Sequence, residues 1–204
     1  MFIASKQIHK GDRELQDRAE FFWRGSNLVL IVADGAGGTS GGAEAAEFVV
    51  KSVKERISSL DLDSESLTDL VASLDREMAA NGSFGETTCV VVALSSAGIV
   101  GTSVGDSGAF AFSNAGVESL TANQLRKPFV GSGRAVPVGF TGSSLEGTLL
   151  LASDGLLKYT SLEKIAATVA IADIDDAAKK LVELVRYRSG ALPDDVSVLL
   201  ARKT

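Results

Sequence analysis

The fold is decided by residues 87–120, which read TTCVVVALSSAGIVGTSVGDSGAFAFSNAGVESL. Four short apolar runs follow one another there, at Cys89–Leu94, Ile99–Val104, Ala109–Phe112 and Val117–Leu120. Glycine-containing turns separate these runs, and such a pattern is typical of strands joined by hairpins. The segment therefore predicts an antiparallel meander.

Before this segment, the sequence predicts a hairpin followed by two helices. Val29–Ala33 is a buried-strand run that follows Phe21–Trp23 across a turn at Arg24–Asn27. Two stretches then carry apolar residues at spacings of three and four, which favours amphipathic helices. They contain first Ala46, Val49, Val53, Ile57 and Leu60, and then Leu67, Leu70, Val71, Leu74 and Met78, with a stop at Asn81-Gly82.

After the meander, the sequence predicts a long loop, two strands and two helices. Gln124–Ser144 has no clear period and is expected to be a surface loop, whereas Leu149–Ala152 predicts a strand. Thr160–Glu163 has the spacing of a capping box that would begin a short helix. The last two elements are a longer helix that ends in Arg188-Ser189-Gly190 and a strand, marked by Ile174, Ala178, Leu181 and Val185 and by Val196–Leu200.

This order of elements predicts an α+β fold rather than a parallel α/β sheet, because strands and helices do not alternate. We expect a β-sandwich of two antiparallel sheets flanked by pairs of helices, in four layers αββα, which would bury the all-apolar strands on both faces. No repeat, linker or change in composition interrupts residues 1–204. The prediction is a single domain.

The composition excludes several classes of partner. The longest apolar runs have six residues, which is far too few to span a membrane. The N-terminus turns polar at once and has no signal-peptide hydrophobic region. We therefore expect a cytoplasmic protein with no membrane partner. A net charge of −6 and a pI of about 4.9 argue against nucleic acid, whose phosphates require Lys and Arg.

The composition also excludes several kinds of catalytic site. One His and one Cys cannot form a zinc site of His and Cys ligands. A Ser-His-Asp triad would have to recruit His9 from a polar stretch. Cys89 has Ser95, not the Arg of a cysteine phosphatase, six positions later, so we expect it to be packed in a strand.

The candidate functional residues are aspartates at the ends of the apolar runs. They are Asp17, Asp34, Asp106, Asp154, Asp194 and Asp195. Carboxylates that converge at one sheet edge repel each other unless a cation neutralises them, and oxygen ligands select Mg²⁺ or Mn²⁺. The alternative for any single Asp is a turn residue that satisfies backbone N–H groups. Asp173-Ile-Asp175 is expected to cap a helix.

Five motifs in chain order carry a family resemblance. They are VADGAGG (Val32–Gly38), TTCVVVAL (Thr87–Leu94), VGDSG (Val104–Gly108), LLASDGL (Leu150–Leu156) and PDDVSVLL (Pro193–Leu200). Each is weak alone, but in this order they resemble the metal-dependent Ser/Thr phosphatases of the protein phosphatase 2C type. The fold that this resemblance implies, a β-sandwich flanked by pairs of helices, agrees with the order of elements.

The resemblance implies a centre of two Mn²⁺ or Mg²⁺ ions. Asp34 would bridge both ions and the Gly35 carbonyl would bind one of them, whereas Asp154 and Asp194 would hold the other. Asp17 would support the centre, with Gln16 where the family often has Glu. A water between the ions would then attack phosphorus in line. Arg13 is the candidate for binding the substrate phosphate.

The chain departs from the family pattern at several positions. Ala36 stands where eukaryotic members often have His, so protonation of the leaving group would fall to a metal-bound water, which we favour, or to His9. Gly108 replaces the Arg that often follows GDS. Lys158 stands where the family commonly has a second Asp, and we expect it to face Asp106 and make a third ion there weak or absent. The alternative is that Lys158 points to solvent beside Tyr159 and leaves Asp106 to bind an ion through waters.

The implied function is hydrolysis of phosphoserine and phosphothreonine in proteins, in opposition to a Ser/Thr kinase. One alternative is a non-catalytic phosphoprotein-binding or signalling module on the same fold, and a subsidiary enzymatic alternative is an anti-sigma-pathway phosphatase. Clustered acids favour an enzyme, because a pure binder has no need of carboxylates that repel each other.

Overall fold

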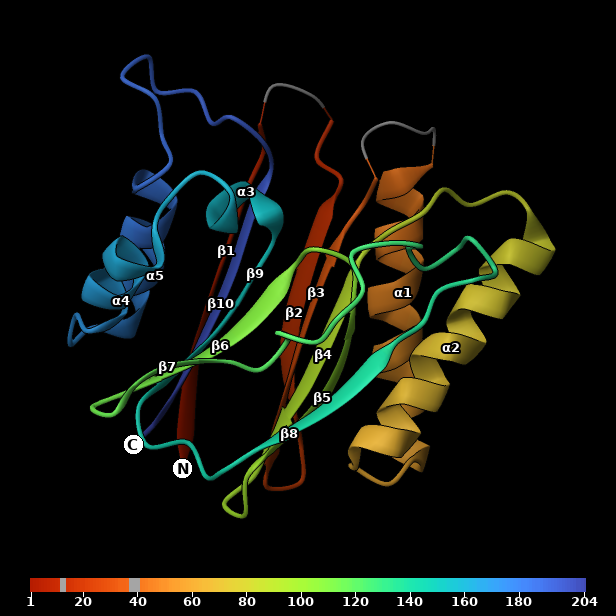
Figure 1. The fold of residues 1–204 in the computed structure, drawn as a ribbon, viewed down its shortest axis with the longest axis horizontal. Coiled ribbons are helices and arrows are strands. Elements are labelled where there is room, and N and C mark those ends of the chain that lie inside the picture. The colour runs from red at the N-terminus through yellow and green to blue at the C-terminus, as the bar shows by residue number, and fades with distance from the viewer. Residues whose placement is uncertain (12–13, 37–40) are drawn as a thin grey trace.

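The computed structural model describes residues 1–11, 14–36 and 41–204. In these residues, two antiparallel sheets of five strands each lie face to face (Figure 1). The first sheet has the order β1 (Phe2–His9), β10 (Val196–Lys203), β9 (Thr148–Ala152), β6 (Gly108–Ser113) and β7 (Gly116–Ser119). The second has the order β2 (Asp17–Arg24), β3 (Asn27–Asp34), β4 (Cys89–Leu94), β5 (Ile99–Val104) and β8 (Val138–Gly142).

Two pairs of helices cover the outer faces of the sandwich (Figure 1). Helices α1 (Gly42–Arg56) and α2 (Ser64–Asn81) pack on the second sheet, and a short 3₁₀ helix, Ile57–Ser59, continues α1. Helices α4 (Leu162–Val169) and α5 (Ile174–Glu183) cover the first sheet. A single turn, α3 (Asp154–Leu157), lies at the end of the sandwich opposite the two termini. The predicted four-layer αββα fold is confirmed.

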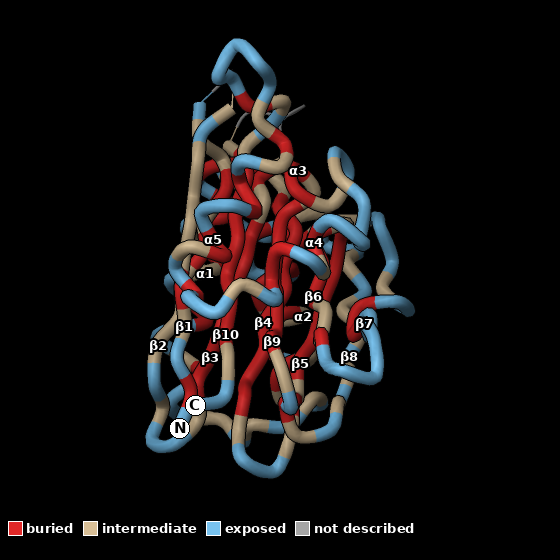
Figure 2. The backbone as a smooth tube through the Cα atoms, turned by 90° about the vertical axis from the view of Figure 1, so that its left-hand side faces the viewer, coloured by how far each residue is buried: buried red, intermediate tan, exposed pale blue. Residues whose placement is uncertain are grey.

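Strand β3 shows why its run Val29–Ala33 contains no polar residue. Successive side chains point to opposite faces of a sheet, and here both faces are buried. Leu28, Leu30 and Val32 pack between the two sheets, whereas Val29 and Ile31 pack beneath α1 and α2. The same division applies to β4 and β10, and Figure 2 shows the central strands as buried along their length.

Helix ends follow the local chemistry of the sequence. The backbone N–H of Ser66 donates to Asp63 Oδ1 at 2.7 Å, which caps α2. Gly82 ends the same helix at φ 68°, a left-handed conformation that favours glycine. Asp173 caps α5 through the N–H of Asp176 at 2.8 Å, as predicted.

The predicted continuous meander is wrong at its centre. Strands β4 and β5 form one hairpin and β6 and β7 form another, but β5 and β6 belong to different sheets. The chain crosses the sandwich at Gly105–Ser107, where Gly105 has φ 105°. Strand β5 pairs with β8 and strand β6 with β9, partners that lie far along the chain. The turn therefore connects two layers instead of closing a hairpin.

Other elements differ from the sequence prediction for reasons of exposure. Strand β8 lies inside the supposed loop 124–144 as an edge strand whose residues are half-buried or exposed. Strand β1 was not predicted; it is an edge strand of the first sheet, and most of its residues are half-buried or exposed. The N-cap of α4 is Ser161, not Thr160, so the expected capping box is displaced by one residue. Helix α5 ends at Glu183, before the predicted Arg188-Ser189-Gly190.

No helix in the described part of the chain is both long enough and apolar enough to cross a membrane.

Candidate metal centre

The hairpin of β2 and β3 places two carboxylates side by side at its open end. Asp17 and Asp34 are direct partners in the antiparallel register, so their side chains lie on the same face as near neighbours. Asp17 is only 1% exposed, and neither of its carboxyl oxygens makes a hydrogen bond of normal geometry to another described residue. An orphaned buried carboxylate is costly, and this one adjoins a second carboxylate.

Burial and mutual repulsion raise the pKa values of both groups. The pKa of Asp17 is raised mainly by burial and further by the charge of Asp195, against partial lowering by the nearby Ser153 and Ser197 hydroxyls. The pKa of Asp34 is raised by burial first and then by the charges of Asp17, Asp154 and Asp106 in decreasing order. Asp34 is therefore within electrostatic reach of three other acids.

The acids of the two motifs nearest the C-terminus, Leu150–Leu156 and Pro193–Leu200, interact electrostatically with this pair and with each other. Burial raises the pKa of Asp154, and the charges of Asp106 and Asp194 raise it further, whereas Lys158 and Arg126 lower it. Five of the aspartates predicted from the sequence, Asp17, Asp34, Asp106, Asp154 and Asp194, are thus brought to one end of the sandwich, from both sheets. This common location agrees with their positions at strand ends, and their role as metal ligands stays a prediction.

The backbone of Asp34 is held by the two threonines that precede β4. Thr88 donates its N–H to the Asp34 carbonyl at 2.9 Å and accepts the Asp34 N–H on Oγ1 at 2.9 Å. Thr87 Oγ1 donates to the same carbonyl at 3.0 Å. Gly35 follows, and a Cβ atom built there would overlap the Gly42 carbonyl. Glycine is therefore required for the close approach between this turn and the start of α1.

A second close approach brings the late motifs together. Ser153 donates its N–H to the Ser197 carbonyl at 3.1 Å, and Ser197 returns its N–H to Ser153 Oγ at 2.9 Å. A Cβ atom on Gly155 would overlap the carbonyl oxygen of Asp195. Because the α3 turn packs directly on this backbone, Asp154 lies within the field of the exposed Asp194.

Asp195 has a positioning role that the sequence did not assign. Its carboxylate accepts the backbone N–H of Gly11 at 2.7 Å and that of Gln16 at 2.6 Å. It thereby ties both ends of residues 11–16 to the start of β10. The only signal in the sequence was its place beside Asp194, because the two partners are 184 and 179 residues away.

Asp106 has a different cationic partner from the one expected. Its Oδ2 accepts a hydrogen bond from Arg126 Nε at 2.9 Å. The exposed Lys158 instead places its Nζ 5.6 Å from the centre of the Tyr159 ring. The α3 turn directs Lys158 towards Tyr159, so the expectation that it faces Asp106 is corrected.

Comparison with known proteins identifies the architecture that carries these acids. The sequence model of the family described as Protein phosphatase 2C matches residues 5–131. The chain belongs to the protein phosphatase 2C family. The match contains the first three of the five motifs, and the family resemblance is thereby confirmed.

Curated relatives and solved structures agree with this family membership. The Ser/Thr protein phosphatase PstP of Mycobacterium tuberculosis is 28% identical over 213 residues, which cover 85% of this chain. The chain spans about 40% of the length of this relative. A bacterial serine phosphatase superposes with a TM-score of 0.87 at 22% identity, covering 99% of this chain and 98% of the other.

A second solved structure is the catalytic domain of PstP in complex with two manganese ions. It superposes with a TM-score of 0.79 at 18% identity, covering 98% of this chain and 97% of the other. At these identities the superpositions show that the fold is shared.

The acids of this family member have the chemistry of a hard-cation site. The buried, unpartnered oxygens of Asp17 and the raised pKa of Asp34 are features that a divalent cation would relieve. Within residues 1–11, 14–36 and 41–204, however, no three acidic, His or Cys side chains lie close enough to ligate a common ion. The carboxylates lie around Asp34, but in the described part of the chain their oxygens do not converge on a common ion position.

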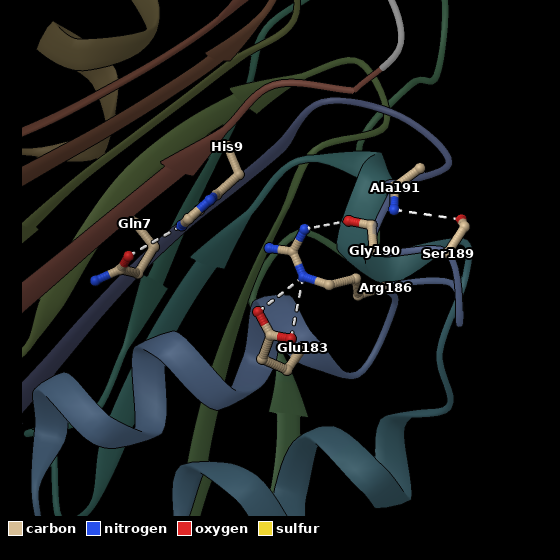
Figure 3. A network of polar contacts seen from close by, with 7 residues as sticks. All are labelled: Gln7, His9, Glu183, Arg186, Ser189, Gly190 and Ala191. Atoms are coloured by element: carbon tan, nitrogen blue, oxygen red, sulfur yellow. Dashed lines mark hydrogen bonds and ion pairs between the residues drawn. The ribbon is translucent and has the colours of Figure 1, made fainter.

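The two remaining predicted residues have different outcomes. Arg13, the candidate phosphate ligand, lies outside the described residues. His9 Nε2 lies 3.1 Å from Gln7 Oε1, and Figure 3 shows this pair on β1 near the network of Arg186 with Glu183 and Gly190. Because Ser5 on the same strand bonds Asp175 of α5 at 2.6 Å, the alternation of side chains places His9 on the outer face of the sheet.

Cys89 is buried in β4, as predicted, and burial raises its pKa to about 12. The thiolate, which is the reactive form of cysteine, is therefore suppressed.

Proposed function

We propose that this chain is a Mg²⁺- or Mn²⁺-dependent phosphatase that hydrolyses phosphoserine and phosphothreonine in proteins. The observation that carries the proposal is the buried pair Asp17–Asp34, which lies within the field of Asp106 and Asp154. If these acids served only the stability of the fold, we would expect Lys or Arg side chains to neutralise them. Membership of the protein phosphatase 2C family and the Mn²⁺-bound PstP domain support a pair of divalent ions as the counter-charge.

The ligands proposed for these ions are oxygen donors. Asp34 would be a ligand of both ions, and the Gly35 carbonyl would be a ligand of one of them. Asp154 and Asp194 would be ligands of the other ion, and Asp17 would support the centre beside Asp34. When bound, the two ions would supply a water of lowered pKa for in-line attack on phosphorus and positive charge for the phosphoryl oxygens.

The chain's own residues would organise this reaction. Thr87 and Thr88 hold the Asp34 backbone through three hydrogen bonds, so the central carboxylate needs little reorganisation. Asp195 fixes both ends of residues 11–16. We propose that Arg13, in this segment, binds two phosphate oxygens, since a guanidinium matches that geometry.

Protonation of the leaving group is assigned to water. Ala36 has no ionisable group, and the His9 ring is bonded to Gln7 on the outer face of the sheet.

The test is hydrolysis of a small aryl phosphate and of a phosphothreonine peptide with Mn²⁺, Mg²⁺ or excess EDTA. Metal-dependent release of phosphate that disappears in Asp34→Asn, but persists in the matched control Asp173→Asn, would support the proposal. A folded protein that binds a phosphopeptide without turnover in either metal would instead establish the non-catalytic binding module.

The finer parts of the proposal concern cellular context. We propose a single catalytic domain over residues 1–204 and a cytoplasmic location, where phosphorylated Ser/Thr proteins made by an opposing kinase would be the substrates. Neither nucleic acid nor membrane is proposed as a partner.

A further inference from the structure

The cation beside Asp106 is supplied by the protein itself. We propose that Arg126 takes the place of a third divalent ion at Asp106, so that the centre holds two ions and binds another only weakly. The inference rests on the proposed metal-dependent function, and it assigns to Arg126 a role in determining how many ions bind. The direct contact is the ion pair from Arg126 Nε to Asp106 Oδ2 at 2.9 Å.

The segment that carries Arg126 is bonded on both sides of Asp106. The Gly105 N–H donates to the Leu125 carbonyl at 3.0 Å. Gln124 Nε2 donates to the Ser107 carbonyl at 2.7 Å. Residues 124 and 125 are therefore hydrogen-bonded to the two neighbours of Asp106. This places the next residue, Arg126, beside the Asp106 carboxylate.

The same segment is anchored again further along the chain. Val130 and Thr87 exchange two backbone hydrogen bonds of 2.9 and 3.0 Å, and Thr87 also bonds the Asp34 carbonyl. The buried Asp75 of α2 then accepts the N–H groups of Gly131, Gly133 and Ala135, at 2.8, 3.0 and 3.0 Å. Gly131, Gly133 and Ala135 continue the segment that carries Arg126. Residues 124–135, called the strap from here on, are therefore held by hydrogen bonds on both sides of Arg126.

The chemistry of the guanidinium suits this role. A guanidinium is a permanently charged group in proteins, so Asp106 has a positive partner. An incoming ion would have to displace this partner and would also meet its repulsion. Because the Arg126 side chain is 72% exposed, the ion pair itself is weak, and the effect on an additional ion is expected to be about tenfold in affinity rather than absolute.

Lys158 provides a matched control for this argument. It is a second cation at the same end of the sandwich, and it lowers the pKa of Asp154. Its Nζ lies against the Tyr159 ring and makes no ion pair with Asp106. If general positive charge at the rim excluded the additional ion, Lys158→Ala and Arg126→Ala would behave alike.

The experiment counts bound Mn²⁺ directly, by equilibrium dialysis with electron paramagnetic resonance of the free ion, up to low-millimolar metal. We expect two ions in the unmodified protein, in Lys158→Ala and in Arg126→Lys, and three in Arg126→Ala. The double variant Arg126→Ala/Asp106→Asn should return to two. Circular dichroism and thermal melts would verify that each variant is folded.

The outcomes separate this inference from the proposed function. Three ions in the unmodified protein, or two in Arg126→Ala, would overturn the role of Arg126 while leaving the phosphatase proposal intact. An unchanged ion count together with a raised KM in Arg126→Ala would overturn it too, and would make Arg126 a substrate-binding residue. If no form of the protein bound Mn²⁺, both the metal centre and this inference would be wrong.

Discussion

Replacement of Asp17 by Asn should stabilise the metal-free protein at high pH. The pKa of the Asp17 carboxyl rises from 3.8 in the unfolded chain to about 7 in the folded protein. The folded state therefore holds this proton more tightly, and the associated stability is present at low pH and lost as the pH rises through about 7. The full difference corresponds to about 4 kcal/mol of unfolding free energy.

The cost of burying an amide works against this gain. An Asn side chain without full hydrogen bonding would cost about 1–3 kcal/mol, although the Ser153 and Ser197 hydroxyls are nearby. That cost does not depend on pH, so the difference between two pH values reports the Asp17 carboxylate together with its effect on the pKa of the neighbouring Asp34. From pH 5.5 to 8.5, a range above the pI of about 4.9, the unmodified protein should lose about 2 kcal/mol more than Asp17→Asn.

The assay is urea denaturation of both proteins in EDTA at the two pH values, with Asp173→Asn as the control. Asp173 caps α5 on the exposed surface, and Asn caps a helix about as well as Asp, so its variant should change by less than about 0.5 kcal/mol, equally at both pH values. Saturating Mn²⁺ should reverse the order at pH 8.5, because the ions stabilise the protein that retains its carboxylate. A difference between the unmodified protein and Asp17→Asn that does not change with pH would refute the argument.

Three further changes test other parts of the site. Asp34→Asn and Asp154→Asn should each lower kcat by at least about 100-fold at saturating Mn²⁺, and near-normal rates in both folded variants would contradict the assignment. Activity should vanish in EDTA yet survive in Cys89→Ser, since the pKa of the buried thiol is about 12; loss of activity in that folded variant would point to thiol chemistry. Asp75→Ala should lower the unfolding free energy by about 3 kcal/mol in urea denaturation, because three backbone N–H groups lose their acceptor; a loss under about 0.5 kcal/mol would show that the strap does not depend on it.

The elements that could be predicted were those buried on both faces or periodic over several turns. Strands β3, β4, β9 and β10 are apolar runs because each packs on the other sheet and on a helix pair. The edge strands β1 and β8 lack this signal, since one edge of each meets solvent and most of their residues are only half-buried or exposed. Their polar residues are compatible with a loop until a neighbouring strand supplies hydrogen bonds.

The crossing between β5 and β6 shows a second limit. The turn Gly105–Ser107 has the composition of a hairpin, and the residues of a turn do not determine which sheet the next strand joins. That choice depends on β8 and β9, whose pairing partners are distant in sequence. Local chemistry can therefore predict that the chain turns but not into which layer.

Which acids lie together could be predicted from the residues alone, because Asp17, Asp34, Asp106 and Asp154 each adjoin the end of an apolar strand, and such ends meet at the edge of a sandwich. Which partners those acids have depends on how distant segments pack. Arg126 reaches Asp106 because the segment before it docks on Gly105 and Ser107, and no spacing in the sequence encodes that docking. Burial and the order of the strands determine where the acids lie. Contacts between segments that are distant in sequence and do not pair as strands determine which groups the acids contact.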